Sequence, residues 1–270
     1  MISCKNLKVG YEEKVIIENL SLSINKGEVV SIIGPNGCGK STLLKTLSRI
    51  IKPMSGGIYI QNESIKNLKS KHISQKVCLL SQHNDAPGDL TVEELVYFGR
   101  IPHKKWYESK TKSDEEIVNW AIENTGLKRY KNTPINSLSG GERQRAYIAQ
   151  ALCQKPDILL LDEPTTYLDM THQIEVLDLL FELNETEQRT IVMVLHDLNL
   201  ACRYADNIVA IQDKQIYAQG KPEEVVDEKL VRDVFRMECQ ISTDPLFGTP
   251  LCIPHGRGRR LVKKVAQAMR

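Results

Sequence analysis

The sequence predicts an α/β fold with a mostly parallel sheet, an antiparallel β part near the N-terminus and an inserted helical region. Apolar runs such as EVVSII, ILLLDE and TIVMVLH show no alternation with polar residues. Strands of this kind are covered on both faces, as they are in a parallel sheet. A helix-like segment, IEVLDLLFEL, lies between two of these runs, which is the order expected of strand–helix units.

The first third of the chain alternates short β-branched runs with turn signals. The run VIIENLSLSI ends at the turn Asn25-Lys26-Gly27, and EVVSII leads into a glycine-rich loop. Two further runs, SGGIYIQ and VCLLSQ, have the same character. We expect all four to be strands.

The character of the chain changes between about residue 84 and residue 155. Thr91 with Glu94, and Ser113 with Glu116, have the spacing of a capping box that opens a helix. The second of these helices, DEEIVNWAIENT, should stop at Gly126, because glycine adopts the left-handed conformation of a C-cap. This part is therefore expected to be a helical insertion.

Strand–helix alternation resumes after Pro156, and NIVAIQDKQIYAQG is typical of a hairpin with Asp213-Lys214 near its turn. We expect one main domain over 1–235, made of a core (1–83 and 156–235) and a helical subdomain (about 84–155). Residues 236–270 would form a C-terminal extension with a basic tail.

Charge and composition exclude several classes of protein. The 36 Lys and Arg residues nearly balance the 34 Asp and Glu residues in a chain of 270, so the body is not strongly basic and no nucleic-acid partner is expected. The basic tail after Gly256 is expected to be a solvated or disordered terminus, with anionic lipid or nucleic acid as alternatives. No apolar run is long enough to span a membrane, and the N-terminus lacks a secretory signal. Seven scattered cysteines without a C-x-x-C pair indicate reduced thiols in a cytosol.

A glycine-rich phosphate-binding loop lies between an apolar strand and a helix-like segment. The stretch GPNGCGKST satisfies the pattern G-x-x-x-x-G-K-[ST]. Its glycines let successive backbone N–H groups face a phosphate at the positive end of a helix. Lys40 would meet the β- and γ-phosphates and the Ser41 hydroxyl would coordinate Mg²⁺. We expect nucleotide binding by Gly34, Pro35, Asn36, Gly37, Cys38, Gly39, Lys40, Ser41 and Thr42.

Two adjacent carboxylates end the apolar strand ILLLDE. Mg²⁺ is a hard cation that keeps most of its waters, so one carboxylate acting through water is enough to hold it. Asp162 fits that role. Glu163 is then free to act as the general base that orients the attacking water.

The heptapeptide LSGGERQ, residues 138–144, is the third motif. Together with the two motifs above, it resembles the signature of the ATP-binding subunits of ABC transporters, and the resemblance covers nearly the whole chain. Ser139, Gly140 and Gly141 form a small-residue turn at the start of a helix, which is a second anion-binding helix N-terminus. The resemblance implies a P-loop NTPase core of the RecA-like ABC ATPase type. It also implies a head-to-tail dimer, in which this turn closes on ATP held by the glycine-rich loop of a second copy.

Other positions match the family pattern one at a time. Gln82 follows the strand VCLLS, at the place of the Q-loop glutamine that touches Mg²⁺ or water and flexes toward the membrane partner. His196 matches the switch histidine that holds the γ-phosphate, and Asp169 matches the D-loop that contacts the opposing site. Tyr11 lies where the family stacks an aromatic ring on adenine. The thiol of Cys38 is expected to be filler, unless Lys40 and the helix N-terminus make it reactive.

The resemblance implies that the chain hydrolyses ATP with Mg²⁺ at the cytoplasmic face of a membrane. It implies separate integral permease subunits and, indirectly, an extracytoplasmic substrate-binding protein. FGRIPH and the ending DPLFGTPLCIPHGR are similar to the ATPases of ferric-siderophore importers. The alternatives are a cobalamin or haem importer ATPase, or a soluble ABC ATPase scaffold such as in iron–sulfur cluster assembly.

Overall fold

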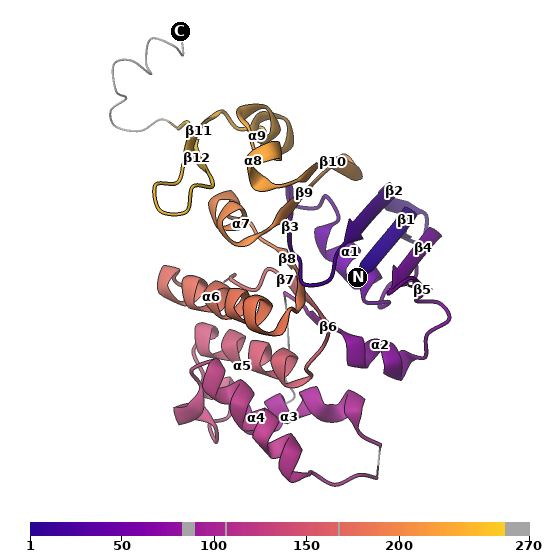
Figure 1. Ribbon diagram of the computed structural model, residues 1–270, viewed down its shortest axis with the longest axis vertical. Helices are drawn as coiled ribbons and strands as arrows, with labels where there is room; N and C mark the ends of the chain where they lie inside the picture. The colour runs from indigo at the N-terminus through magenta and orange to yellow at the C-terminus, as the bar shows by residue number, and fades with distance from the viewer. Residues whose placement is uncertain (83–89, 106, 167, 257–270) are drawn as a thin grey trace.

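The computed structural model describes residues 1–82, 90–105, 107–166 and 168–256, so the basic tail lies outside the described residues. A six-stranded sheet runs through the middle of the molecule in the order β10-β9-β3-β8-β7-β6 (Figure 1). Its strands β3, β6, β7, β8 and β9 pair in parallel, and β10 pairs antiparallel with β9. The predicted α/β fold with a mostly parallel sheet is confirmed. The strands are β3 (Val29–Ile33), β6 (Val77–Leu80), β7 (Ile158–Asp162), β8 (Thr190–Val194), β9 (Asn207–Gln212) and β10 (Gln215–Gly220).

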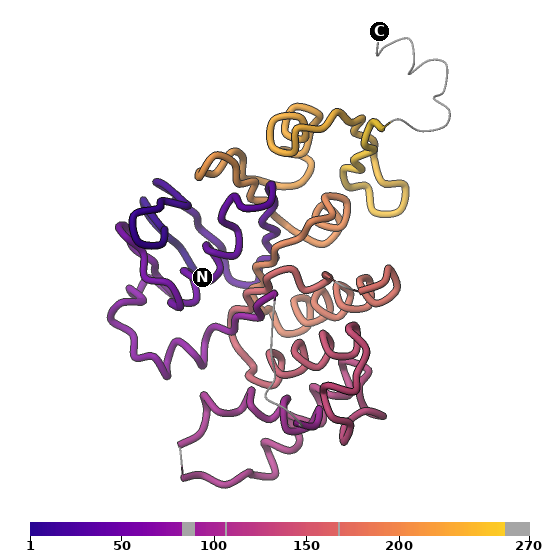
Figure 2. Tube along the Cα trace, turned by 180° about the vertical axis from the view of Figure 1, so that it is seen from behind, coloured from indigo at the N-terminus to yellow at the C-terminus, as the bar shows by residue number. Residues whose placement is uncertain are grey.

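Both faces of this sheet are buried, which explains the continuous apolar strands. In β7, Ile158 and Leu160 point into one core while Leu159 and Leu161 point into the other. The first core lies beneath α1 (Lys40–Leu47) and a four-stranded N-terminal sheet. The second lies beneath the remaining large helices, including α6 (Met170–Glu187) and α7 (Leu198–Tyr204). Figures 1 and 2 show the N-terminal sheet and α6 on opposite sides of the central sheet.

The N-terminal sheet is antiparallel and has the strand order β2-β1-β4-β5. Its strands are β1 (Ile2–Tyr11), β2 (Lys14–Ile24), β4 (Ser55–Ile60) and β5 (Glu63–Ser64). The short helix α2 (Ser70–Lys76) then leads into β6. The strands expected in the first third of the chain are therefore present.

A group of helices follows β6 and lies at the lower end of the view in Figure 1. It contains α3 (Val92–Tyr97), η1 (Phe98–His103), α4 (Lys112–Asn124), η2 (Lys128–Tyr130), η3 (Ile135–Ser137) and α5 (Gly140–Cys153). Thr91 and Glu94 form the expected capping box of α3. The expected box of Ser113 and Glu116 is wrong, because Thr111 and Asp114 cap α4 two residues earlier.

The C-terminal part packs beside α7. It consists of α8 (Pro222–Val225), α9 (Glu228–Phe235) and a hairpin of β11 (Cys239–Thr243) and β12 (Pro250–Pro254) that the sequence did not lead us to expect. Asn199 of α7 accepts a hydrogen bond from the Cys252 backbone N–H at 2.7 Å and donates to its carbonyl at 3.2 Å. Arg203 pairs with Asp244 at 2.7 Å. These contacts fix the hairpin to the helix that follows His196.

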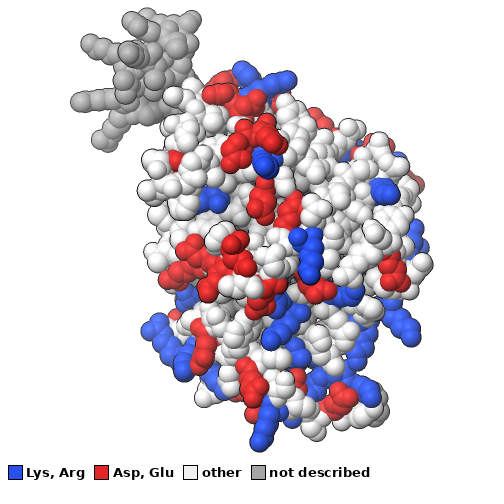
Figure 3. Space-filling view, in the orientation of Figure 1, with Lys and Arg blue, Asp and Glu red and all other residues white. Residues whose placement is uncertain are grey.

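The described surface carries mixed charge. On the face shown in Figure 3, Lys and Arg residues are interspersed with Asp and Glu, so the described part of that face has no continuous basic stripe. Among the described helices, we find none with both the length and the hydrophobicity needed to cross a bilayer. All seven cysteines are free thiols.

Candidate nucleotide site

The glycine-rich loop joins β3 to α1 and follows the backbone conformations that its glycines permit. Gly39 is the N-cap of α1 and has a φ of 107°, in the left-handed region that side chains rarely adopt. A Cβ at Gly39 would also lie 2.8 Å from Ile16 Cγ2. Gly34 has a φ of 148°, and a Cβ there would lie 2.3 Å from the carbonyl oxygen of Ile211. Larger residues at these positions would open the loop.

The ammonium of Lys40 is folded back onto its own loop. It donates to the carbonyl oxygens of Gly34 at 2.9 Å and Pro35 at 3.0 Å, and only 5% of the residue is exposed. The loop carbonyls thus hold the one cation of the motif at its centre. A phosphate cradled by the loop would offer this ammonium a stronger, charged acceptor.

Ser41 and Asp162 meet at the edge of the same loop. The Ser41 hydroxyl, in the first turn of α1, donates to Asp162 Oδ1 at the end of β7 over 2.9 Å. Burial raises the pKa of Asp162, and the hydrogen bond from Ser41 opposes that shift. A hydroxyl and a carboxylate this close supply hard oxygen ligands, so the residues present fit a Mg²⁺ ion.

Glu163 contacts side chains that follow the two strands beside β7. Gln82, beyond the end of β6, donates from Nε2 to Glu163 Oε2 at 2.5 Å. His196, beyond the end of β8, has its Nε2 atom 2.6 Å from Glu163 Oε1. Because β7 lies between β6 and β8, the carboxyl ends of the three strands bring these side chains together. The positive φ of Glu163, 55°, shows that its backbone adopts a conformation uncommon for a residue with a side chain.

Thr166 also contacts Glu163 and is a residue of the site that the sequence did not lead us to expect. Its hydroxyl donates to Glu163 Oε2 at 3.0 Å, and its backbone N–H donates to the Glu163 carbonyl at 3.2 Å. The sequence signal for this contact is a hydroxyl residue, Thr166, three positions after the Glu163 carboxylate in a turn. The structure thus adds one hydroxyl to the expected constellation.

These groups surround one cavity of about 370 Å³. It is lined by Ile16, Asn36, Gly37, Gly39, Lys40, Ser41, Thr42, Gln82, Glu163 and His196. Pro35 and Cys38 line a neighbouring cavity of about 500 Å³, together with residues of β2 and of the β9–β10 turn. Burial raises the pKa of the Cys38 thiol, and the charge of Lys40 opposes that shift.

Tyr11 ends β1 and is 50% exposed. Its register partner, Lys14, lies two residues before Ile16, which lines the cavity. Tyr11 is not itself among the lining residues. The structure places it on the strand pair that flanks the loop.

The remaining expected residues lie at the starts of two other helices. Ser139 is the N-cap of α5 and forms a capping box with Glu142, and Gly140 and Gly141 open the helix. Asp169 is the N-cap of α6 and accepts from the His172 backbone N–H at 2.9 Å. None of these four residues is among those that line the 370 Å³ cavity.

Comparison with known proteins agrees with this arrangement. The ABC transporter family matches residues 17–166, which include the glycine-rich loop, the Ser139 turn and the carboxylates that end β7. The chain belongs to the ABC transporter family. It carries the ATP-binding and ATP-hydrolysing part of that family.

Two curated ABC transporter relatives match over nearly their full length. The petrobactin import ATP-binding protein FpuD of Bacillus anthracis is 64% identical, over 100% of this chain and 98% of the relative. The Probable siderophore transport system ATP-binding protein YusV of Bacillus subtilis is 57% identical, over 98% of this chain and 96% of the relative.

Two solved structures of ABC proteins share the fold. One is an inward-facing metal-chelate type ABC transporter, with a TM-score of 0.82 and 26% identity over 95% of this chain and 97% of that chain. The other is a dimeric ATP-binding cassette in a post-hydrolysis state with ADP and Pi. It has a TM-score of 0.72 and 32% identity over 82% of this chain and 98% of that chain.

Proposed function

We propose that the chain is the ATP-hydrolysing subunit of a bacterial ABC importer that drives uptake of a ferric siderophore through separate permease subunits. The convergence of Lys40, Gln82, Glu163 and His196 on one cavity supports the ATPase activity, as does the hydrogen bond of Asp162 to Ser41 in its lining. The names of the two curated relatives support the cargo class. The subunit would then act at the cytoplasmic face of the membrane, beneath the permease.

Different residues around the cavity would bind the phosphates, hold Mg²⁺ and activate water. The backbone N–H groups of the loop and the Lys40 ammonium would bind the phosphates. Ser41, Asp162 and Gln82 would hold Mg²⁺, which supplies positive charge against the phosphate oxygens. Glu163 accepts a proton from the attacking water and orients it, while His196 holds the γ-phosphate.

The other site residues would act on different parts of ATP. Tyr11 would stack on the adenine ring. The signature turn, Ser139, Gly140 and Gly141, would close on the nucleotide of a second copy, with Asp169 beside it. The N-terminus of α1 lines the cavity and that of α5 does not, which supports this head-to-tail pairing.

Coupling to the permease would occur in the helical region. We propose the ATPase domain over 1–235 with core segments 1–83 and 156–235, a helical subdomain over about 84–155, and a C-terminal extension over 236–270. A permease loop would contact the segment that follows Gln82, up to about Pro102. Residues 83–89 of that segment lie outside the described residues, whereas α3 and η1 lie within them.

Uptake of labelled ferric siderophore by a strain that lacks the gene tests the proposal. Under iron limitation, we expect the deletion strain to lose uptake and the wild-type gene to restore it. The Glu163→Gln gene should fail to restore it, because its product binds ATP but turns it over slowly. An extracytoplasmic substrate-binding protein that delivers the siderophore should be required in the same assay.

Other outcomes separate the alternatives. Normal siderophore uptake with lost cobalamin or haem uptake would assign the chain to one of those importers. Intact uptake of all three cargoes, with only soluble proteins co-purifying, would favour the scaffold function.

A further inference from the structure

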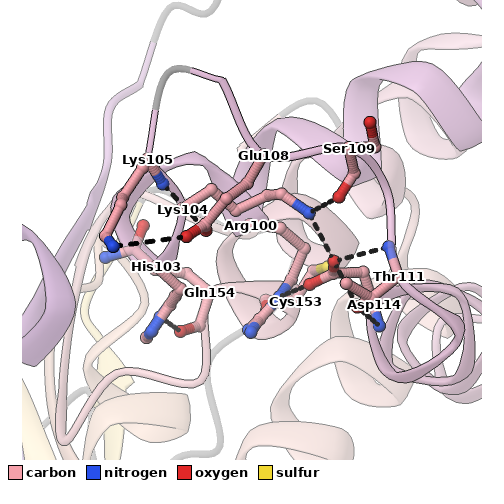
Figure 4. A network of polar contacts seen from close by, with 10 residues as sticks. All are labelled: Arg100, His103, Lys104, Lys105, Glu108, Ser109, Thr111, Asp114, Cys153 and Gln154. Carbon is pink, nitrogen blue, oxygen red and sulfur yellow. Dashed lines mark hydrogen bonds and ion pairs between the residues drawn. The ribbon is translucent and has the colours of Figure 1, made fainter.

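Outside the nucleotide site, Asp114 of α4 lies in a cluster of polar contacts (Figure 4). Its carboxylate contacts Arg100 Nε at 3.1 Å and Lys104 Nζ at 2.7 Å. The three side chains are only 8–11% exposed. Burial raises the pKa of Asp114, but hydrogen bonds from Lys104, Thr111 and Arg100 together hold that pKa well below its ordinary value. The carboxylate is therefore ionised and shared by two cations.

The two cations come from a different element than the helix that Asp114 caps. The capping box of α4 needs only Thr111, whose backbone N–H and hydroxyl donate to Asp114 Oδ2 at 3.0 and 2.7 Å. Arg100 lies in η1 and Lys104 is its C-cap residue. Asp114 therefore has a second function besides capping. Through Arg100 and Lys104 it attaches η1 to the start of α4.

The same short helix is also attached to the end of α5. Arg100 Nη1 donates to the Cys153 carbonyl at 2.9 Å, and His103 Nε2 donates to the Gln154 carbonyl at 2.7 Å. These carbonyls end α5, where the helix dipole favours positive charge. Gly99 allows the close approach, since a Cβ there would lie 2.3 Å from the Gln150 carbonyl oxygen.

Gln154 extends these contacts to the central sheet. Its Nε2 donates to the carbonyls of Ser74 at 2.6 Å and Val77 at 3.1 Å. Val77 begins β6, the strand that leads to Gln82, and α5 begins next to Ser139. Helix α5 therefore connects η1 to the signature turn. Strand β6, through Gln154, connects η1 to Gln82.

We propose that Arg100 and Asp114 are positioning residues that make η1 and the C-terminal end of α5 move as one body. This inference rests on the proposed function, in which a permease contacts the segment containing η1. A displacement of η1 would then shift α5 and its signature turn, which couples permease contact to closure of the site. Coupling of this kind requires an element with two arrangements, and in this proposal the attached helices would be that element.

The experiment compares basal and permease-stimulated ATPase activity in the reconstituted transporter. For Arg100→Ala and Asp114→Asn, the basal kcat and KM of the cassette alone should remain at wild-type values. Stimulation by permease and loaded binding protein should fall by about 2- to 30-fold, the range of typical coupling effects. Arg100→Lys should restore stimulation only in part. The planar guanidinium of arginine donates to Asp114 and to the Cys153 carbonyl at the same time, and the single ammonium of lysine does not have that geometry.

Lys128→Ala is the matched control. It removes an exposed ion pair with Glu123 near the other end of α4, where the Lys128 side chain is 80% exposed, and should leave stimulation unchanged. The proposal is overturned if Arg100→Ala and Asp114→Asn retain full stimulation, or if basal activity and stimulation fall in proportion. Absence of stimulation in the wild-type complex would instead contradict the proposed function.

Discussion

Glu163 illustrates how much of the chemistry depends on the placement of single residues. Its neighbour Asp162 faces Ser41, whereas Glu163 faces Gln82, Thr166 and His196. The positive φ of Glu163 at the end of β7 turns the second carboxylate away from the first. Two adjacent acids therefore have different partners and can take different roles.

Substitution of Glu163 by Gln should separate nucleotide binding from hydrolysis. The amide cannot accept the proton of water, so turnover should fall by about 10² to 10⁴ fold. ATP affinity should persist, because the glycine-rich loop and Ser41 are unchanged. Single-turnover ATPase assays and titration with a fluorescent ATP analogue would check both; near-wild-type turnover would remove Glu163 from the role of base.

Substitution of Lys40 by Ala should instead reduce the affinity for ATP. The loss of a charged hydrogen bond to phosphate should weaken ATP binding by about 10- to 100-fold. Lys52→Ala, which changes an exposed lysine beyond α1, is the control and should bind normally. The same titration would measure both variants, and equal affinities for ATP would contradict the role of Lys40.

At the scale of elements, α4 shows where local patterns are ambiguous. Ser113 with Glu116 and Thr111 with Asp114 both have the spacing of a capping box, but the helix uses the second pair. Arg100 and Lys104, which come from η1, contact the Asp114 carboxylate of the pair that the helix uses. The side chain that caps this helix therefore also meets a separate element, which the local spacing does not reveal.

Asp114→Asn should destabilise the protein in a pH-dependent manner. The pKa of Asp114 is lowered in the folded state, so its contribution is fully present above the unfolded pKa and is lost as the pH falls. We expect a loss of about 2 kcal/mol at neutral pH, below the value for a fully buried pair. This difference from wild type should shrink below about pH 4, where the carboxylate of the unfolded chain becomes protonated.

Urea unfolding of both proteins across this pH range would measure the effect. Glu115→Gln, on an exposed position of the same helix, should show little difference from wild type. A constant difference at all pH values would contradict the assigned ionisation.

At the scale of the whole molecule, the glycine-containing motifs expected to meet phosphate open α1 and α5, and the described cavity lies beside α1. The cavity is lined by the glycine-rich loop and by residues at the ends of β6, β7 and β8, and the signature turn is not part of it. A second copy packed head-to-tail would bring that turn to the nucleotide. Activity should then depend on the encounter of two chains.

The ATPase activity per molecule should therefore rise with protein concentration in the dilute range. Ser139→Arg should abolish hydrolysis, because the larger side chain obstructs closure, while ATP binding by the monomer persists. Ser113→Arg places the same residue at the start of α4 and should retain activity. Activity strictly proportional to concentration from dilute monomer would rule out the two-chain site.

The sequence by itself determined the α/β class, the glycine-rich loop, the terminal carboxylates of β7 and the signature turn. These features follow from local requirements: apolar strands, positive φ at Gly39, and a serine that caps a helix. Tertiary structure alone decided which groups meet. The contacts of Thr166 with Glu163, of Arg100 with Asp114, and of Asn199 with the β11–β12 hairpin depend on side-chain positions and on the packing of separate elements. Such contacts leave no periodic pattern in the sequence, because hydrogen bonds between distant residues require only proximity in the folded chain.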